Sequence, residues 1–96
     1  EYIDGAGPSL LDEPEAGLSA IRQMALLGQI AEEVRQGAQF VIATHSPVLM
    51  AFPGTTIYEI GEHGIRTTAL EQTEAFTALA EFFDDPRGTV DFLLGE

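Results

Sequence analysis

The chain has 96 residues, of which 16 are acidic and four are basic, so its formal charge at pH 7 is -12. A surface this acidic repels phosphate backbones, which argues against direct binding of nucleic acid or an anionic membrane by this chain. The length allows one domain at most, and the absence of cysteine excludes disulfides and thiolate metal sites.

The sequence begins with a stretch rich in turn-forming residues. Glycine and proline punctuate residues 1–9, which predicts a linker or a ragged start. Leu10 and Leu11 then predict a strand that ends at the acidic residues 12–15. Because the proline at position 8 cannot donate to a central ladder, this strand is either short or begins at Ser9.

A helix and a second strand are expected next. Ser19 can cap a helix whose apolar residues recur every three or four positions, and Gly37 is placed to end it in a left-handed conformation. The apolar residues of this pattern are Ile21, Met24, Leu27, Ile30 and Val34. The run FVIAT at 40–44 predicts a strand covered on both faces. Strand, helix and strand in this order form a βαβ unit, which favours parallel pairing and a right-handed crossover.

The second half of the sequence predicts a hairpin followed by helices. Residues 57–60 and 65–68 flank a four-residue loop that contains His63, which we expect to be exposed to solvent. Apolar residues at 75–83 predict a short amphipathic helix with phenylalanines in a core, and Pro86 breaks it. The last apolar residues, at 90–94, predict one or two further turns. The fold class is therefore α/β.

Three residues could carry chemistry at one edge of the predicted sheet. Asp12 and Glu13 end the first strand and His45 follows the second, and parallel strands bring their carboxyl ends to the same edge, where open α/β sheets bind ligands. One carboxylate can hold Mg²⁺ through water, while its neighbour orients an attacking water. A neutral imidazole can donate to that water or to a phosphate oxygen.

Each of these residues also has a structural interpretation. The paired carboxylates can stabilise the dipole of the helix that follows, and the imidazole can be satisfied locally at the strand end. Thr44 and Ser46 are either polar ligand contacts or turn formers. The other carboxylates are most simply solvated.

Two motifs in order carry a family resemblance. LLDEPEAGLS at 10–19 resembles the Walker B motif and D-loop of ABC-class P-loop ATPases, and FVIATHSP at 40–47 resembles the strand and switch-histidine loop that follow them. Glu15 stands where ABC transporters more often have Thr or Ser, and Ser19 stands where they more often have Asp. The sequences of the two motifs are more similar to those of soluble AAA/ABC-like ATPases, which are relatives of DNA-repair and phage-defence ATPases.

The resemblance implies a P-loop NTPase fold of the ABC-ATPase type and assigns roles. Asp12 would hold Mg²⁺ through water, Glu13 would position the hydrolytic water, and His45 would sense the γ-phosphate. The D-loop would face the partner subunit of an ATP-sandwiched homodimer, and its residues are Ala16, Gly17, Leu18 and Ser19. ATP and Mg²⁺ would be the cofactors of a cytoplasmic ATPase.

Two motifs of that family are missing from the sequence. The Walker A loop is absent, since a chain without lysine cannot supply its lysine, and the ABC signature motif is absent too. We therefore expect residues 1–96 to be the C-terminal part of an ATPase domain, a view that the start at Glu1 rather than Met also suggests. Its core would span 10–47 and its hairpin and helices 48–96. Alone it should neither bind ATP nor hydrolyse it. An N-terminal half or a partner chain would supply Walker A.

Two other functions stay open at this point. The chain could be a stand-alone, non-catalytic interaction module derived from such an ATPase, whose open parallel edge would need a partner. It could also be a small metal-dependent hydrolase built on Asp12, Glu13 and His45, although no further ligand has convincing spacing.

Overall fold

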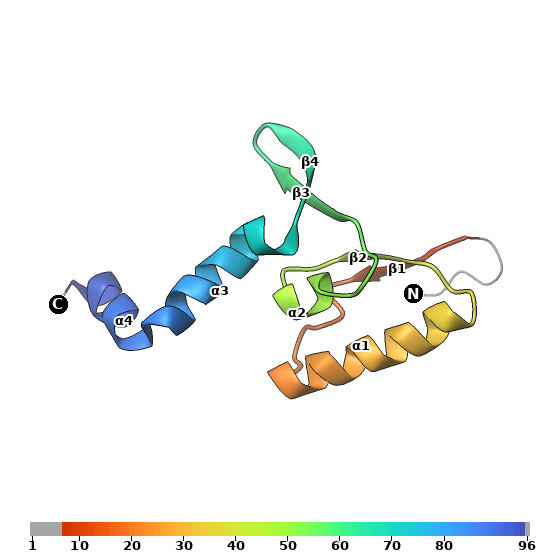
Figure 1. Cartoon of the computed structure of the whole chain (residues 1–96), viewed down its shortest axis with the longest axis horizontal. Helices are drawn as coiled ribbons and strands as arrows, with labels where there is room; N and C mark the ends of the chain where they lie inside the picture. Colours follow the sequence, from red (N-terminus) through yellow and green to blue (C-terminus); the bar gives the residue numbers. More distant parts are fainter. Residues whose placement is uncertain (1–6, 96) are drawn as a thin grey trace. The chain divides into compact units, whose positions relative to one another are not determined.

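The computed structural model describes residues 7–95, which form two compact units that divide between Thr55 and Thr56 (Figure 1). The elements of the first unit are β1 (Ser9–Asp12), α1 (Ala20–Arg35), β2 (Phe40–Ala43) and α2 (Pro47–Met50). Those of the second unit are β3 (Ile57–Gly61), β4 (Gly64–Thr68), the 3₁₀ helix η1 (Leu70–Gln72), α3 (Glu74–Asp84) and α4 (Pro86–Leu94). Residues 1–6 of the predicted linker lie outside the described part.

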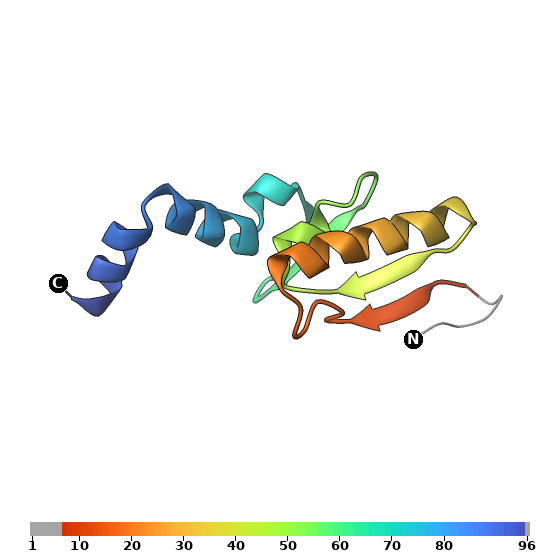
Figure 2. The same cartoon turned by 90° about the horizontal axis from the view of Figure 1, so that it is seen from below.

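The first unit is organised by a parallel pair of strands. β1 and β2 pair in parallel, with Ser9 opposite Phe40 and Asp12 opposite Ala43. Between them α1 runs alongside the strand pair and returns the chain to the start of β2 (Figures 1 and 2). The predicted order of strand, helix and strand and the parallel pairing are therefore confirmed. β1 begins at Ser9, directly after the proline.

The ends of α1 follow from local chemistry. The Ser19 hydroxyl accepts a hydrogen bond from the Arg22 N–H at 3.2 Å, which satisfies a donor that the first turn leaves free. After the helix, Gly37 has a φ of 100° and donates its N–H to the Val34 carbonyl at 2.9 Å. A left-handed residue at this place is typical of a helix end, and only glycine adopts it without strain. Both predicted boundaries are confirmed.

The apolar core of the described residues is small. Ile30 of α1 and Leu49 of α2 are its buried apolar side chains. Leu10 and Val41 lie opposite each other in the register and are 54% and 57% exposed. The prediction that the second strand is covered on both faces is therefore wrong for residues 7–95, because these residues cover only one face of the strand pair.

The hairpin of the second unit turns more tightly than predicted. β3 and β4 pair in antiparallel fashion from Ile57 opposite Thr68 to Gly61 opposite Gly64. The expected four-residue loop was wrong, since the two glycines still belong to the ladder and only Glu62 and His63 connect the strands. The His63 side chain is 99% exposed, as predicted.

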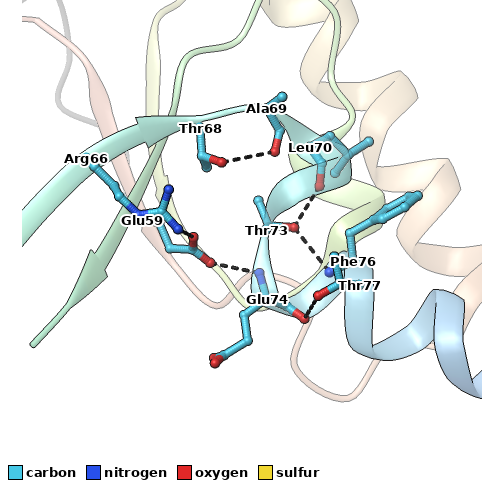
Figure 3. A network of polar contacts seen from close by, with 9 residues as sticks. All are labelled: Glu59, Arg66, Thr68, Ala69, Leu70, Thr73, Glu74, Phe76 and Thr77. Atoms are coloured by element: carbon cyan, nitrogen blue, oxygen red, sulfur yellow. Dashed lines mark hydrogen bonds and ion pairs between the residues drawn. The ribbon is translucent and has the colours of Figure 1, made fainter.

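A carboxylate ties this hairpin to the first turn of α3 (Figure 3). Glu59 of β3 accepts from the Arg66 guanidinium at 2.9 Å with one oxygen and from the backbone N–H of Glu74 at 2.9 Å with the other. The buried Thr73 caps the same helix by accepting from the Phe76 N–H at 3.1 Å. The backbone N–H of Glu74, in the first turn of α3, therefore has a hydrogen-bond acceptor on β3.

The C-terminal helices differ from the prediction in two respects. α4 has nine residues rather than one or two turns, because Pro86 starts it and the Asp85 carboxylate caps it through the Gly88 N–H at 3.0 Å. Phe83 is 68% exposed, so its predicted core position is wrong, although its ring meets Phe82 edge to face at 5.5 Å. Within residues 7–95, no helix has both the length and the apolar character needed to cross a membrane.

Ser9 offers a test of how polar burial affects the first unit. Its hydroxyl is buried and has no hydrogen-bond partner in the part of the chain that the structure describes. Because Ser9→Ala removes an unsatisfied group, we expect the free energy of unfolding to stay unchanged or to rise by about 1 kcal/mol. Urea unfolding followed by circular dichroism measures it.

Ser46 is the matched control, since its buried hydroxyl donates to Gln23 at 2.6 Å and accepts from the Leu49 N–H at 3.3 Å. Ser46→Ala should lower the free energy of unfolding by about 1–2 kcal/mol. Equal losses in both alanine variants would contradict the assignment of Ser9 as unsatisfied.

Candidate functional site

The parallel strands bring one carboxylate and one imidazole together at their carboxyl edge. Asp12 and Ala43 are the last paired residues of β1 and β2, and the Glu13 N–H extends the ladder by donating to the Ala43 carbonyl at 2.7 Å. This places Nε2 of His45 3.9 Å from Oε2 of Glu13. The distance suits an ion pair with a protonated imidazole, or two groups that share a small ligand.

Both side chains stand on an open surface. The Glu13 side chain is 55% exposed and that of His45 is 89% exposed, and Asp12 is exposed as well. Within residues 7–95, no neighbour packs around the imidazole tightly enough to shield it from water. The edge can therefore meet a ligand without rearrangement, and it would exclude water only when a further surface covers it.

Glu13 holds an unusual backbone conformation. Its φ is 49°, and among residues 7–95 it is the one residue other than glycine with a positive φ. For a residue with a Cβ this left-handed region costs about 1–2 kcal/mol. The turn is closed by hydrogen bonds from the Ala16 N–H to the Glu13 carbonyl at 3.0 Å and from the Leu18 N–H to the Glu15 carbonyl at 2.9 Å. Strain of this kind is often found at functional sites.

Glu15 connects the turn after β1 with the loop after β2. Its Oε2 accepts a hydrogen bond from the backbone N–H of His45 at 3.2 Å, although the two residues are 30 positions apart. Its Oε1 is buried and has no partner in hydrogen-bond geometry within the described residues. Glu15 belongs to the motif at residues 10–19, but the sequence alone assigns no role to it. The available signal was its departure from the Thr or Ser of transporters.

The environment of Glu15 favours its charged form. Burial raises the pKa of this carboxyl, but the Thr44 hydroxyl, the backbone N–H groups of Glu15 and His45, and the His45 charge together outweigh it. The pKa of Glu15 therefore lies below its usual value near 4.5. The carboxylate is ionised at neutral pH, where it can hold the His45 backbone through a charge-assisted hydrogen bond.

The rest of the loop after β2 is held by turn and cap contacts. Thr44 accepts from the Ser46 N–H at 2.9 Å, and Ser46 caps α2 and donates to Gln23. Gln23 in turn donates to the Leu18 carbonyl at 3.2 Å, so one amide of α1 contacts both segments that flank the edge. Of the two interpretations of Thr44 and Ser46, the structure shows the turn chemistry.

The four predicted D-loop residues lead from the turn into α1. Ala16 and Gly17 are exposed, Leu18 is half-buried, and Ser19 is the helix cap described above. Their contact with a second subunit stays a prediction.

For a metal, Asp12 and its neighbours offer little by themselves. In residues 7–95, no three His, Asp or Glu side chains are grouped closely enough to hold a metal ion. Mg²⁺ commonly takes one or two carboxylates and completes its shell with water and phosphate oxygens. Asp12 is thus compatible with such a role only as one ligand among several that come from elsewhere.

Comparison with known proteins bears on the same region. Residues 9–51 match a family model described as "AAA domain, putative AbiEii toxin, Type IV TA system". These residues are similar to an AAA-type ATPase domain. The matched segment runs from β1 to the end of α2 and contains Asp12, Glu13 and His45. Searches of curated proteins and of solved structures gave no match. The family match thus supports a P-loop ATPase-like region at residues 9–51.

The strain at Glu13 can be measured by substitution. Because glycine adopts a positive φ freely, Glu13→Gly should unfold with a free energy about 1 kcal/mol greater than Glu13→Ala. The matched control is the exposed position Gln29 in the middle of α1. There Gly should be less stable than Ala by about 1 kcal/mol, since glycine is a poor helix former. The same order of Gly and Ala at both positions would disprove the strain.

The lowered pKa of Glu15 predicts a pH-dependent contribution to stability. The folded state binds a proton at Glu15 more weakly than the unfolded state does, so protonation favours unfolding. The stabilisation is present above the usual pKa near 4.5 and is lost as the pH falls through the lowered value. Wild type should therefore exceed Glu15→Gln in free energy of unfolding at neutral pH, and the difference should shrink in acid. Urea titrations from neutral to acidic pH measure this, and a pH-independent difference would contradict it.

Proposed function

We propose that this chain supplies Asp12, Glu13 and His45 to Mg²⁺-dependent ATP hydrolysis in a cytoplasmic, soluble ATPase of the AAA/ABC-like class. The observation that carries the proposal is the 3.9 Å approach of His45 Nε2 to Glu13 Oε2 at the carboxyl edge of a parallel strand pair. The similarity of residues 9–51 to an AAA domain supports it.

The proposed roles follow from the chemistry of each group. The Glu13 carboxylate orients a water for in-line attack on the γ-phosphate and accepts its proton. The His45 imidazole, on the neighbouring loop, donates a hydrogen bond to a γ-phosphate oxygen and so senses the nucleotide. Asp12 is the residue that would hold Mg²⁺, through water. When bound with ATP, Mg²⁺ supplies positive charge that offsets the negative charge of the phosphates.

The phosphate cradle must come from outside these 96 residues. The chain has no lysine and a formal charge of -12, so it lacks the cation of a Walker A loop and repels a triphosphate on its own. The exposure of Glu13 and His45 agrees with a nucleotide bound between this edge and another surface. In this proposal residues 16–19 face the second subunit of a homodimer.

Replacement of the water-positioning carboxylate tests the proposal. In the complete ATPase, Glu13→Gln should lower kcat by about 100-fold or more while ATP binding persists, because the amide keeps the shape and cannot accept the proton. Phosphate release and equilibrium nucleotide binding measure the two effects. Glu33→Gln is the matched control, since Glu33 is exposed on α1, and it should change neither. Normal turnover in Glu13→Gln would refute the proposed role.

A further inference from the structure

We propose that Glu15 is a positioning residue, whose carboxylate fixes the His45 backbone and thereby keeps the imidazole beside Glu13. The inference rests on the proposed function and deepens it, because it assigns the group that orients the γ-phosphate sensor.

The imidazole needs such support because its own surroundings do not provide it. The His45 side chain is 89% exposed, and its approach to Glu13 is 3.9 Å, which is too long for a hydrogen bond. With so little packing, the direction in which the ring leaves the main chain depends on the backbone of residue 45. The backbone N–H of that residue donates to Glu15 Oε2 at 3.2 Å.

The loop is held on both sides of this hydrogen bond. Before it, Thr44 accepts from the Ser46 N–H at 2.9 Å, and after it, the Ser46 hydroxyl donates to Gln23 at 2.6 Å. The first contact joins the two neighbours of His45 to each other, and the second joins Ser46 to α1. Glu15 supplies the remaining restraint, at the residue that bears the functional ring, and it does so from the turn that presents Glu13.

The burial of Glu15 distinguishes it from the other acidic residues of this edge. Asp12 and Glu13 are exposed, whereas Glu15 is half-buried and its Oε1 is buried without a hydrogen-bond partner in the described residues. A buried carboxylate oxygen is costly unless the rest of the group is compensated. The charge-assisted hydrogen bond from the His45 N–H compensates the group, together with the Thr44 hydroxyl beside the carboxylate. A carboxylate whose only role was to interact with solvent would not be buried at this free-energy cost.

The first experiment follows the His45 amide in the chain itself. In Glu15→Ala, hydrogen exchange of the His45 N–H, measured by NMR, should be faster by about tenfold or more, as expected for a lost hydrogen bond to a charged group. Exchange of the Glu13 N–H, which donates to the Ala43 carbonyl, should stay unchanged and shows that the strand pair is intact. Glu33→Ala, on the exposed face of α1, should change neither rate.

The second experiment measures hydrolysis in the complete ATPase. Glu15→Ala should lower kcat about tenfold with the KM for ATP unchanged. Glu15→Gln, which keeps an acceptor for the His45 N–H, should restore most of the rate. A purely structural role for Glu15 would instead reduce the folded fraction, which circular dichroism reports, and would leave the kcat of the folded molecules unchanged.

The outcomes separate this inference from the function on which it rests. Unchanged His45 exchange in Glu15→Ala overturns the positioning role, whatever the rate of hydrolysis. Faster exchange together with no hydrolysis in the wild-type ATPase overturns the proposed function. In that case Glu15 still holds the backbone of the loop after β2, but the loop does not serve ATP hydrolysis. Should Glu15→Ala fail to fold, Glu15→Asp takes its place, since its shorter side chain draws the carboxylate back from the His45 N–H.

Discussion

The parallel pairing of β1 with β2 is the constraint on which the rest of the first unit depends. Four residue pairs, from Ser9 with Phe40 to Asp12 with Ala43, set where each of the two strands ends. Both leave at the same edge, so a turn and a loop that are distant in sequence become neighbours. A slip by one residue would exchange the faces of a strand and separate Glu13 from His45. The register therefore decides whether the Glu13 and His45 side chains lie side by side.

Local signals made much of this unit predictable from sequence. A capping serine, an apolar period of three to four and a glycine at the end defined α1, and strand order alone placed Asp12, Glu13 and His45 at one edge. What escaped prediction depends on tertiary geometry. The hydrogen bond from His45 to Glu15 exists because strand pairing brings the loop after β2 beside the turn after β1, which a motif does not reveal. The exposure of Val41 likewise depends on what covers the second face, and an apolar run carries no such information.

Polar contacts have unusual weight here because the apolar core of the described residues is so small. With Ile30 and Leu49 as its buried apolar side chains, the first unit cannot rely on burial to hold two loops in place. Gln23 and Glu15 do this instead, each by joining the segment after β1 to the loop after β2. Such contacts are directional, so they specify the positions of nearby groups more closely than apolar packing of the same strength would.

The distribution of charge explains how the work at this edge would be divided. Asp12, Glu13 and Glu15 lie within four consecutive positions in a chain that has no lysine, so the edge attracts a cation and repels a phosphate. It is suited to hold and orient water, and to present an imidazole, once positive charge has been supplied from elsewhere. The strained φ of 49° at Glu13 fits this view, because a turn that only reversed the chain could use glycine there at lower cost. The strain at Glu13 therefore agrees with the proposal that its carboxylate does more than shape the turn.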